Sequence, residues 1–254
     1  MRKAIVKFLS FFILSSKKRK AFRKRYFDNF IKYCLFNGRY KIKGNNNKII
    51  IVENGIEREL CKYERIKGLD ISINGNNNTI ILHKPLLGIH DSIFEIIGNS
   101  NLIEIGSSPY RIELKVMLKW DCCNRKIIIG DNFSCDLTKI YINEDNGICK
   151  IGNDCMFSNN ITVRTDGHAI LNDKNEVINN FANIEIGNHV WCGEKCTILK
   201  SALIPNNSII GVGSIVTKKY KQENIILAGN PAKIIKENIN WSRYNASYIV
   251  KGRI

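Results

Sequence analysis

The alternation of apolar and polar positions predicts a chain of many short β-strands joined by tight turns. From position 184 onward the pattern has a period of six. One large apolar position recurs at 186, 192, 198, 204, 210 and 216, and a second position, mostly small, follows four places later at 190, 196, 202, 208 and 214. In such a hexad the large side chain fills a flat face and the small one fits beneath the turn. Three hexads make one triangular coil, so 184–220 predicts about two coils of a solenoid.

The upstream body carries a looser repeat of the same kind. A Gly-Asn or Gly-Asp pair stands beside an Ile- and Leu-rich run at each of several places. The spacings between these glycines are too irregular for a propeller and suit solenoid coils with insertions. The glycines are Gly44, Gly75, Gly98, Gly130, Gly152 and Gly187.

Composition supports the same fold class, an all-β solenoid. The 254 residues include 44 Ile, 32 Asn and only four Pro. Ile favours a pleated, packed surface, and Asn tolerates the left-handed turn conformations that end short strands. With 44% apolar residues the chain can bury a substantial core. We expect a solenoid domain over 44–222, preceded by an arm over 1–43 and followed by a C-terminal loop and tail over 223–254.

Charge is concentrated in the arm. The whole chain has a formal charge of +16, but residues 1–43 hold fourteen basic residues and one acid, Asp28, and carry +13 of it. The remaining body is nearly neutral at +3. The high overall charge is therefore a property of the arm, and it does not indicate a nucleic-acid-binding fold.

Cysteine usage and the N-terminal pattern favour a reducing cytoplasm. The nine cysteines are an odd number and form no CxxC pair. The apolar run over 4–14 is followed by basic residues rather than a cleavage site, and it falls short of the roughly 20 residues that span a bilayer. Cys192 and Cys196 lie on hexad positions, which predicts inward-facing structural thiols. The four histidines lack the spacing of the hexapeptide-repeat proteins that resemble zinc carbonic anhydrases, so no metal is expected.

Five motifs resemble bacterial hexapeptide-repeat acetyltransferases. Four belong to the C-terminal half: IGNHVWCG at 186–193, TILK at 197–200, IGVGSIVTK at 210–218 and AGNPAK at 228–233. The fifth, RTDGH at 164–168, resembles the catalytic turn of the capsule and lipopolysaccharide sugar O-acetyltransferases of that family, including those that act on polysialic acid. The resemblance implies a left-handed parallel β-helix, a homotrimer, and acetyl-CoA bound between neighbouring subunits. Handedness rests on the resemblance alone, because parallel crossovers are ordinarily right-handed.

Acetyl transfer to a hydroxyl requires a base, oxyanion donors and a cleft. His168 stands in a polar turn before a stretch, 169–183, that breaks the hexad phase and is suited to wall an acceptor pocket. We expect His168 to be the base, with Asp166 orienting its imidazole. A surface histidine and a plain turn aspartate are the alternatives.

Trp191 occupies an outward position of its hexad. By resemblance it covers the pantetheine arm or the acceptor near the thioester, and packing within the protein is the alternative. The backbone N–H of Cys192 or of Gly193 is expected to serve the oxyanion, and the sequence does not distinguish them. His189 is expected to be structural.

The anionic groups of CoA call for cations and free N–H groups. By resemblance the 228–233 loop lies against the adenine and ribose phosphate, while small residues let the pantetheine arm approach the wall. An exposed lysine pair is also compatible with a simple solvated edge. Besides Trp191 and Gly193, the residues expected to bind the cofactor are Lys200, Gly211, Ser214, Lys218, Lys219, Ala228, Pro231 and Lys233.

The sequence therefore predicts an acetyl-CoA-dependent O-acetyltransferase that acts directly, in a ternary complex, on a bacterial surface-glycan sugar, with sialic acid among the candidate acceptors. Two alternatives stay open: N-acetylation of a nucleotide-linked amino sugar, and a non-catalytic β-helix scaffold. A base is more necessary for a hydroxyl than for an amine, which favours O-acetylation.

The arm allows three interpretations. Aromatic residues at helical spacing over 22–36 predict an amphipathic helix that caps the open end of the solenoid. The basic cluster at 17–25 also suits anionic lipid of the inner membrane, so that a cytoplasmic protein would lie at the membrane surface. Recruitment of an acidic glycan is the third interpretation.

Overall fold

The computed structural model describes residues 38–61, 64–165, 167–179 and 182–251. The predicted helix of the arm, within 22–36, lies outside these residues. Among those described, no helix is long and apolar enough to cross a membrane.

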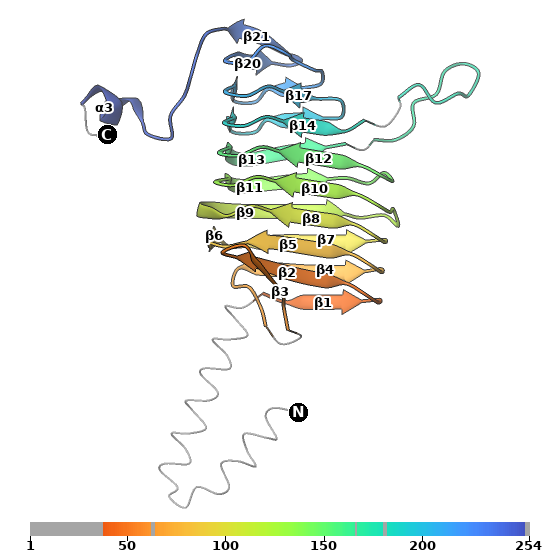
Figure 1. Ribbon diagram of the computed structural model, residues 1–254. Coiled ribbons are helices and arrows are strands. Elements are labelled where there is room, and N and C mark those ends of the chain that lie inside the picture. Colours follow the sequence, from red (N-terminus) through yellow and green to blue (C-terminus); the bar gives the residue numbers. More distant parts are fainter. Residues whose placement is uncertain (1–37, 62–63, 166, 180–181, 252–254) are drawn as a thin grey trace, which may run out of the picture.

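The described chain winds through two sheets whose strands stack coil upon coil (Figure 1). The first sheet contains β1 (Tyr40–Lys43), β4 (Leu69–Asn74), β6 (Leu86–Ile89), β7 (Ser92–Ile97), β9 (Ser108–Leu118), β11 (Ser134–Tyr141), β13 (Met156–Arg164), β15 (Trp191–Cys192), β16 (Thr197–Leu199), β18 (Ile209–Ile210), β19 (Ile215–Val216), β20 (Ile226–Gly229) and β21 (Ala232–Lys236). The second contains β2 (Lys48–Glu53), β3 (Ile56–Glu59), β5 (Thr79–His83), β8 (Leu102–Ile105), β10 (Lys126–Ile129), β12 (Ile148–Ile151), β14 (Ile184–Ile186) and β17 (Leu203–Ile204). A short helix, α3 (Ala246–Val250), lies near the C-terminus.

Pairing within the sheets is parallel except at the two ends. The antiparallel pairs are β2 with β3 and β20 with β21. The first sheet also bends around a corner, because β13 pairs with β15 through Met156 and Phe157 and with β16 through Thr162, Val163 and Arg164. Its two faces and the second sheet enclose the three-sided solenoid that the hexads predict.

The hexads fill the core as expected. All six large positions from Ile186 to Val216 are buried, and so are the five second positions from Val190 to Ser214. Cys192 and Cys196 both point inward, which confirms the prediction for these two thiols. The period can be recognised in the sequence because side chains on each flat face alternate between pointing inward and pointing outward.

Two corners matter for function. Corner A is where the chain passes from the second sheet to the first, as between β12 and β13 or β14 and β15. Corner B is the reverse passage, as between β13 and β14. Corner A is lined by residues with positive φ, one above the other: Asn132, Asp154, His189, Asn207 and Asn224. Asn tolerates this conformation better than most residues, which explains part of the Asn excess.

The glycine repeat divides between these corners. Gly44, Gly75 and Gly98 lie at corner B, after β1, β4 and β7, whereas Gly130, Gly152 and Gly187 lie at corner A. Glycine is required by close stacking: a Cβ on Gly152 would lie 2.5 Å from Asn188 Oδ1 of the next coil. The glycines are therefore spaced irregularly in the sequence because they form two separate columns, one at each corner, rather than one column interrupted by insertions.

A buried ladder of amides runs inside the first coils. Asn78 donates to Asn47 Oδ1, and Asn101 donates to Asn78 Oδ1. The fully buried Arg125 ends the ladder, with its Nε 2.8 Å from Asn101 Oδ1 and its Nη1 3.1 Å from the Ile142 carbonyl oxygen. Burial lowers the pKa of this guanidinium. The ladder satisfies polar groups that would otherwise be unpaired in the core.

Candidate active site

His168 follows β13 at corner B. The loop between β13 and β14 leaves the solenoid (Figure 1). Its side chain is exposed, and its carbonyl oxygen accepts a hydrogen bond from Asn179 Nδ2 at 2.8 Å. Asp166, expected to orient the imidazole, lies outside the described residues. The loop therefore presents His168 to solvent from the base of a projecting segment.

The described part of this loop is a small apolar hairpin. Leu171 and Val177 form an antiparallel bridge, and the Ile178 N–H donates to the Ile170 carbonyl oxygen at 2.8 Å. All four side chains are exposed, although they are large and apolar. Large exposed apolar side chains on a projecting loop are typical of a contact with another molecule.

Lys200 anchors the base of the loop. Its Nζ donates to the Asn179 carbonyl oxygen at 2.9 Å, and the side chain is half-buried. The sequence assigned this lysine to the anionic cofactor. In the structure its ammonium group already holds the segment that carries His168.

Trp191 faces outward from β15, since its neighbour Cys192 faces the core. The indole is half-buried and lies against Trp241, with ring centres 6.2 Å apart and planes inclined by 45°. Its Nε1 is buried and has no hydrogen-bond partner among the described residues. The outward orientation expected from the hexad is confirmed, and the side chain packs within the chain as well.

Next to Trp191, corner A carries a polar cluster that the sequence did not reveal. His189 Nδ1 lies 2.6 Å from Asp154 Oδ2, and Arg243 Nε lies 2.8 Å from Asp154 Oδ1. Burial works against ionisation of Asp154, but the hydrogen bonds from Arg243 and His189 outweigh it and hold the pKa of the carboxyl below its usual value. His189 is thus part of a structural network, in line with the expectation for it.

The structure does not bring His168 and Trp191 together within one chain. Trp191 is in register with Met156 at the start of β13. His168 follows Arg164, which is in register with Leu199 at the far end of the same strand. A full coil face separates the two side chains, because one stands beyond corner A and the other at corner B.

The Gly193 N–H is one of the two groups expected to serve the oxyanion, and the other, the Cys192 N–H, stays a prediction. The Gly193 N–H donates to the Ile210 carbonyl oxygen at 2.8 Å and is therefore engaged in the strand ladder. A Cβ on Gly193 would lie 2.8 Å from Val212 N, and one on Gly211 would lie 3.1 Å from Ala228 Cβ. Both glycines permit the coils to stack closely.

The 228–233 segment forms a tight hairpin on the last coil. Ala228 pairs with Lys233 across β20 and β21, and the turn contains the cis peptide before Pro231. Ser214 is fully buried, and its Oγ accepts from the Gly229 N–H at 3.1 Å. Ser214 therefore supports the hairpin from inside, and its expected role in letting the pantetheine arm approach the wall stays a prediction. Lys218, Lys219 and Lys233 are exposed.

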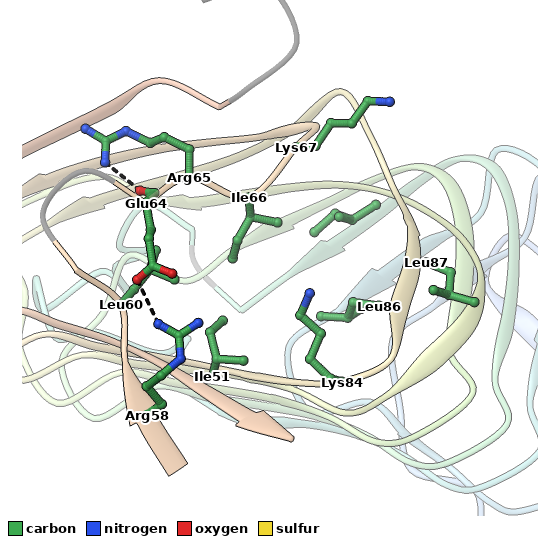
Figure 2. Close-up of a pocket in the computed structure, with 11 residues that line it drawn as sticks. Ile51, Arg58, Leu60, Glu64, Arg65, Ile66, Lys67, Lys84, Leu86 and Leu87 are labelled. Carbon is green, nitrogen blue, oxygen red and sulfur yellow. Dashed lines mark hydrogen bonds and ion pairs between the residues drawn. The ribbon is translucent and has the colours of Figure 1, made fainter. Parts of the chain in front are cut away.

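A cavity of about 550 Å³ lies at the opposite end of the solenoid, among β2, β3 and the turns before β4 and β6 (Figure 2). Its apolar floor includes Ile51, Ile66 and Leu86. Its charged groups are four cations and one acid: Arg58, Arg65, Lys67, Lys84 and Glu64. Arg58 is paired with Glu64 at 2.7 Å. The cavity is distant from the loop and from Trp191, and it holds none of the predicted catalytic residues.

Among the described residues, no three His, Cys, Asp or Glu side chains form a group that could hold a metal ion.

Comparison with known proteins places these features in context. No family model matches the chain. It is 35% identical over 193 residues to a polysialic acid O-acetyltransferase of Neisseria meningitidis, a match that covers 68% of this chain and 89% of the relative. Solved structures are similar as well, and two of them are described here by their fit. The polySia-specific acetyltransferase NeuO superposes with a TM-score of 0.67 at 25% identity, over 85% of this chain and 87% of its own. The polysialic acid O-acetyltransferase OatWY superposes with a TM-score of 0.65 at 29% identity, over 85% and 97%.

Proposed function

The chain belongs to the bacterial hexapeptide-repeat sugar O-acetyltransferases, whose fold is the left-handed β-helix, and from this premise we propose that it transfers the acetyl group of acetyl-CoA to a hydroxyl of a surface-glycan sugar. The observation that carries the proposal is the match to the meningococcal enzyme, which spans 89% of that protein at 35% identity. The same match makes sialic acid of a capsular polymer the first acceptor to test.

In the proposed mechanism His168 is the general base. Its neutral imidazole takes the proton of the sugar hydroxyl as the oxygen attacks the thioester carbonyl carbon. The tetrahedral intermediate then collapses, the C–S bond breaks, and the CoA sulfur leaves with a proton returned by the imidazolium. Transfer is direct, so both substrates must be bound together. Exposure of His168 on the loop supports this role, because a base must reach the acceptor.

The complete site is shared between subunits of a homotrimer. His168 and Trp191 stand at different corners of one chain, and the loop that carries His168 projects with four exposed apolar side chains. A neighbouring copy would cover those side chains and supply its own Trp191 to the His168 of the first. The outward, half-buried indole of Trp191 offers an apolar surface to the pantetheine arm or to the acceptor near the thioester.

Acetyl-CoA lies along the outer wall toward the last coil. Lys218, Lys219 and Lys233 are exposed there and are suited to the phosphates. The hairpin with Ala228 and Pro231 offers a surface for the adenine end, and the close packing at Gly193 and Gly211 keeps that wall smooth.

The test is acetyl transfer from acetyl-CoA to a panel of acceptors that includes sialylated oligosaccharides, neutral oligosaccharides and nucleotide-linked amino sugars. His168→Ala should lower turnover by about 10²- to 10⁴-fold and leave CoA binding intact. His83→Ala, on a distant coil, is the matched control. Turnover of His168→Ala within a few-fold of wild type would show that His168 is not the base. Transfer only to amino sugars would favour N-acetylation, and no transfer to any acceptor would favour a scaffold.

The N-terminal end of the solenoid is the proposed contact with anionic lipid. The cavity in Figure 2 combines four cations with an apolar floor, and Ile56 and Leu87 near it are 71% and 76% exposed. The arm, with its net charge of +13, joins the solenoid here, since the Gly38 N–H donates to the Ile66 carbonyl oxygen. Exposed apolar groups ringed by cations suit an anionic membrane surface.

A further inference from the structure

The segment after the last strand lies back along corner A as an extended strap, defined here as residues 239–243. Its side chains alternate: Ile239, Trp241 and Arg243 face the solenoid, whereas Asn240 and Ser242 are exposed. The Ile239 N–H donates to the Asn224 carbonyl oxygen at 3.0 Å, and Asn224 Nδ2 donates back to the Ile239 carbonyl oxygen. Figure 1 shows the chain descending from β21 on the side opposite the 165–183 loop.

Arg243 locks the far end of the strap. Besides its ion pair with Asp154, its Nη1 donates to Ser134 Oγ at 2.8 Å. Its Nη2 donates to the Asn132 carbonyl oxygen at 2.7 Å, and its guanidinium lies 4.2 Å from the centre of the Tyr110 ring. One side chain thus contacts three successive coils, and a guanidinium with this many partners is held in one orientation.

Trp241 is the middle anchor and is only 8% exposed. Its indole stacks on the His189 imidazole, and its Nε1 donates to the His189 carbonyl oxygen at 2.7 Å. His189 Nε2 in turn lies 3.1 Å from the Trp241 carbonyl oxygen. Both ring nitrogens of His189 face acceptors, Asp154 and this carbonyl, so only the doubly protonated ring donates to both.

Trp241 also lies beside Trp191, with ring centres 6.2 Å apart. An outward tryptophan on a flat solenoid face has two side-chain torsions free to change, and a large ring packed beside it removes that freedom. We propose that the strap is a positioning device: Trp241, fixed by His189 and Arg243, holds the Trp191 indole in the orientation that acetyl transfer requires. The inference rests on the proposed function of Trp191, which contacts the acetyl-CoA or the acceptor, whereas Trp241 acts through Trp191.

Fluorescence tests this role independently of catalysis. The chain has three tryptophans, Trp120, Trp191 and Trp241, so Trp191 is the sole tryptophan in both W120F/W241F and W120F/W241A. The phenylalanine keeps a ring beside Trp191 and the alanine removes it. We expect fast indole motion, seen as a rapid phase of the anisotropy decay, in the alanine variant and its suppression in the phenylalanine variant. Equal decays in the two variants would overturn the proposal, whatever the acceptor.

Kinetics tests the consequence for catalysis. W241A should lower kcat by roughly 10- to 100-fold, because a small misplacement of a positioning group has effects of that size, while the Kd for CoA stays within about twofold. W241F should recover most of the activity, and Y248A, an exposed residue of α3, serves as the control.

If W241A does not fold, R243A loosens the strap and keeps both rings, with a smaller loss in the same direction. A loss of activity in W191A without any in W241A or R243A would overturn the inference and leave the proposed function intact. Loss of CoA binding in W241A would also overturn it.

Discussion

Trp241 stacks on His189 with ring centres 4.2 Å apart and planes inclined by only 11°, although 52 residues separate the two in the chain. The contact joins the C-terminal strap to corner A, directly beside the outward-facing Trp191. The polar cluster of His189, Asp154 and Arg243 at this corner is therefore given no catalytic role of its own. It supports the wall of the proposed acetyl-transfer site that carries Trp191, and the loop with His168 belongs to the opposite wall.

Subunit mixing tests the shared site. H168A and W191A should each be nearly inactive alone. When the two are unfolded, mixed and reassembled, random trimers place an intact His168 beside an intact Trp191 at about a quarter of the interfaces. We expect acetyl transfer to recover to about that fraction of wild type. Reassembled H168A alone is the control, and a mixture no more active than that control would place both residues in the same subunit's site.

Acid should weaken the strap. The pKa of Asp154 lies below its usual value, so the folded state favours the carboxylate. A lowered pKa contributes stability above the ordinary value of 3.8, and this contribution is lost as the pH falls toward the folded-state value. D154N should unfold about 1 kcal/mol more easily than wild type at pH 7, a modest effect because the side chain is partly exposed.

The measurement for this prediction is the free energy of unfolding in urea between pH 7 and pH 3. The difference between D154N and wild type should shrink toward the acid end. A difference that stays constant over this range would show that the ionisation of Asp154 does not stabilise the docked strap.

Arg125 should be among the most sensitive residues of the core. R125A would leave Asn101 Oδ1 and the Ile142 carbonyl oxygen without these donors and would open a void, at a cost of about 3 kcal/mol. R125M fills much of the void and should lose less. The midpoint of denaturant unfolding measures both, with the exposed neighbour Lys126→Ala as the control. A midpoint for R125A equal to that of K126A would contradict the buried ladder.

Thiol reactivity should separate the cysteines by burial. Burial raises the pKa of Cys135, Cys149 and Cys155 to about 12, so these thiols stay protonated at pH 8. Cys61 is exposed. In a Cys34→Ser background, which removes the thiol outside the described residues, we expect a disulfide reagent to modify Cys61 rapidly and the three buried thiols only as the protein unfolds. A fast phase that survives C61S and involves any of the three would contradict their burial.

Removal of the arm distinguishes its three interpretations. Deletion of residues 1–37 should abolish co-sedimentation with vesicles rich in phosphatidylserine, and K84E in the full chain should weaken it, with stronger effects at low salt. A pellet undiminished by the deletion would remove the membrane interpretation of the arm. A lowered melting temperature with unchanged vesicle binding would identify the arm as a cap, and retention of acidic glycan only by the full chain would identify it as a recruiting segment. The exposed Lys236→Glu, at the other end of the solenoid, is the charge-matched control.

The solenoid was predictable because its signal is local. Each large hexad position from Ile186 to Val216 repeats the same environment, and burial follows directly from the period. The outward face of Trp191 follows from the same phase. The corner to which each glycine motif belongs was harder to predict, because a Gly-Asn pair at corner A and one at corner B look alike in sequence. Only the stacking of the coils, as of Gly152 against Asn188, distinguishes them.

The site was only partly predictable. Motifs drew attention to His168 and Trp191, but their separation within one chain depends on which strand of the coil each one follows. The Gly193 N–H, one of the two expected oxyanion donors, is bonded to the Ile210 carbonyl oxygen, and the Lys200 ammonium group is bonded to the loop. The strap left only a faint signal, the alternation of Ile239, Trp241 and Arg243, which has no meaning until a surface is present to receive it.

The amino-acid sequence by itself determined the three-sided solenoid, its inward column of aliphatic and cysteine side chains, and the concentration of net positive charge in the arm. Each of these features depends on a repeat of a few residues or on composition, and neither requires contacts between distant parts of the chain. Tertiary structure decided that His168 and Trp191 stand at different corners, and that Trp241 and Arg243 return across the coils to His189 and Asp154. Those relationships join residues tens of positions apart, and they exist only once the coils have stacked and fixed which side chains share an edge.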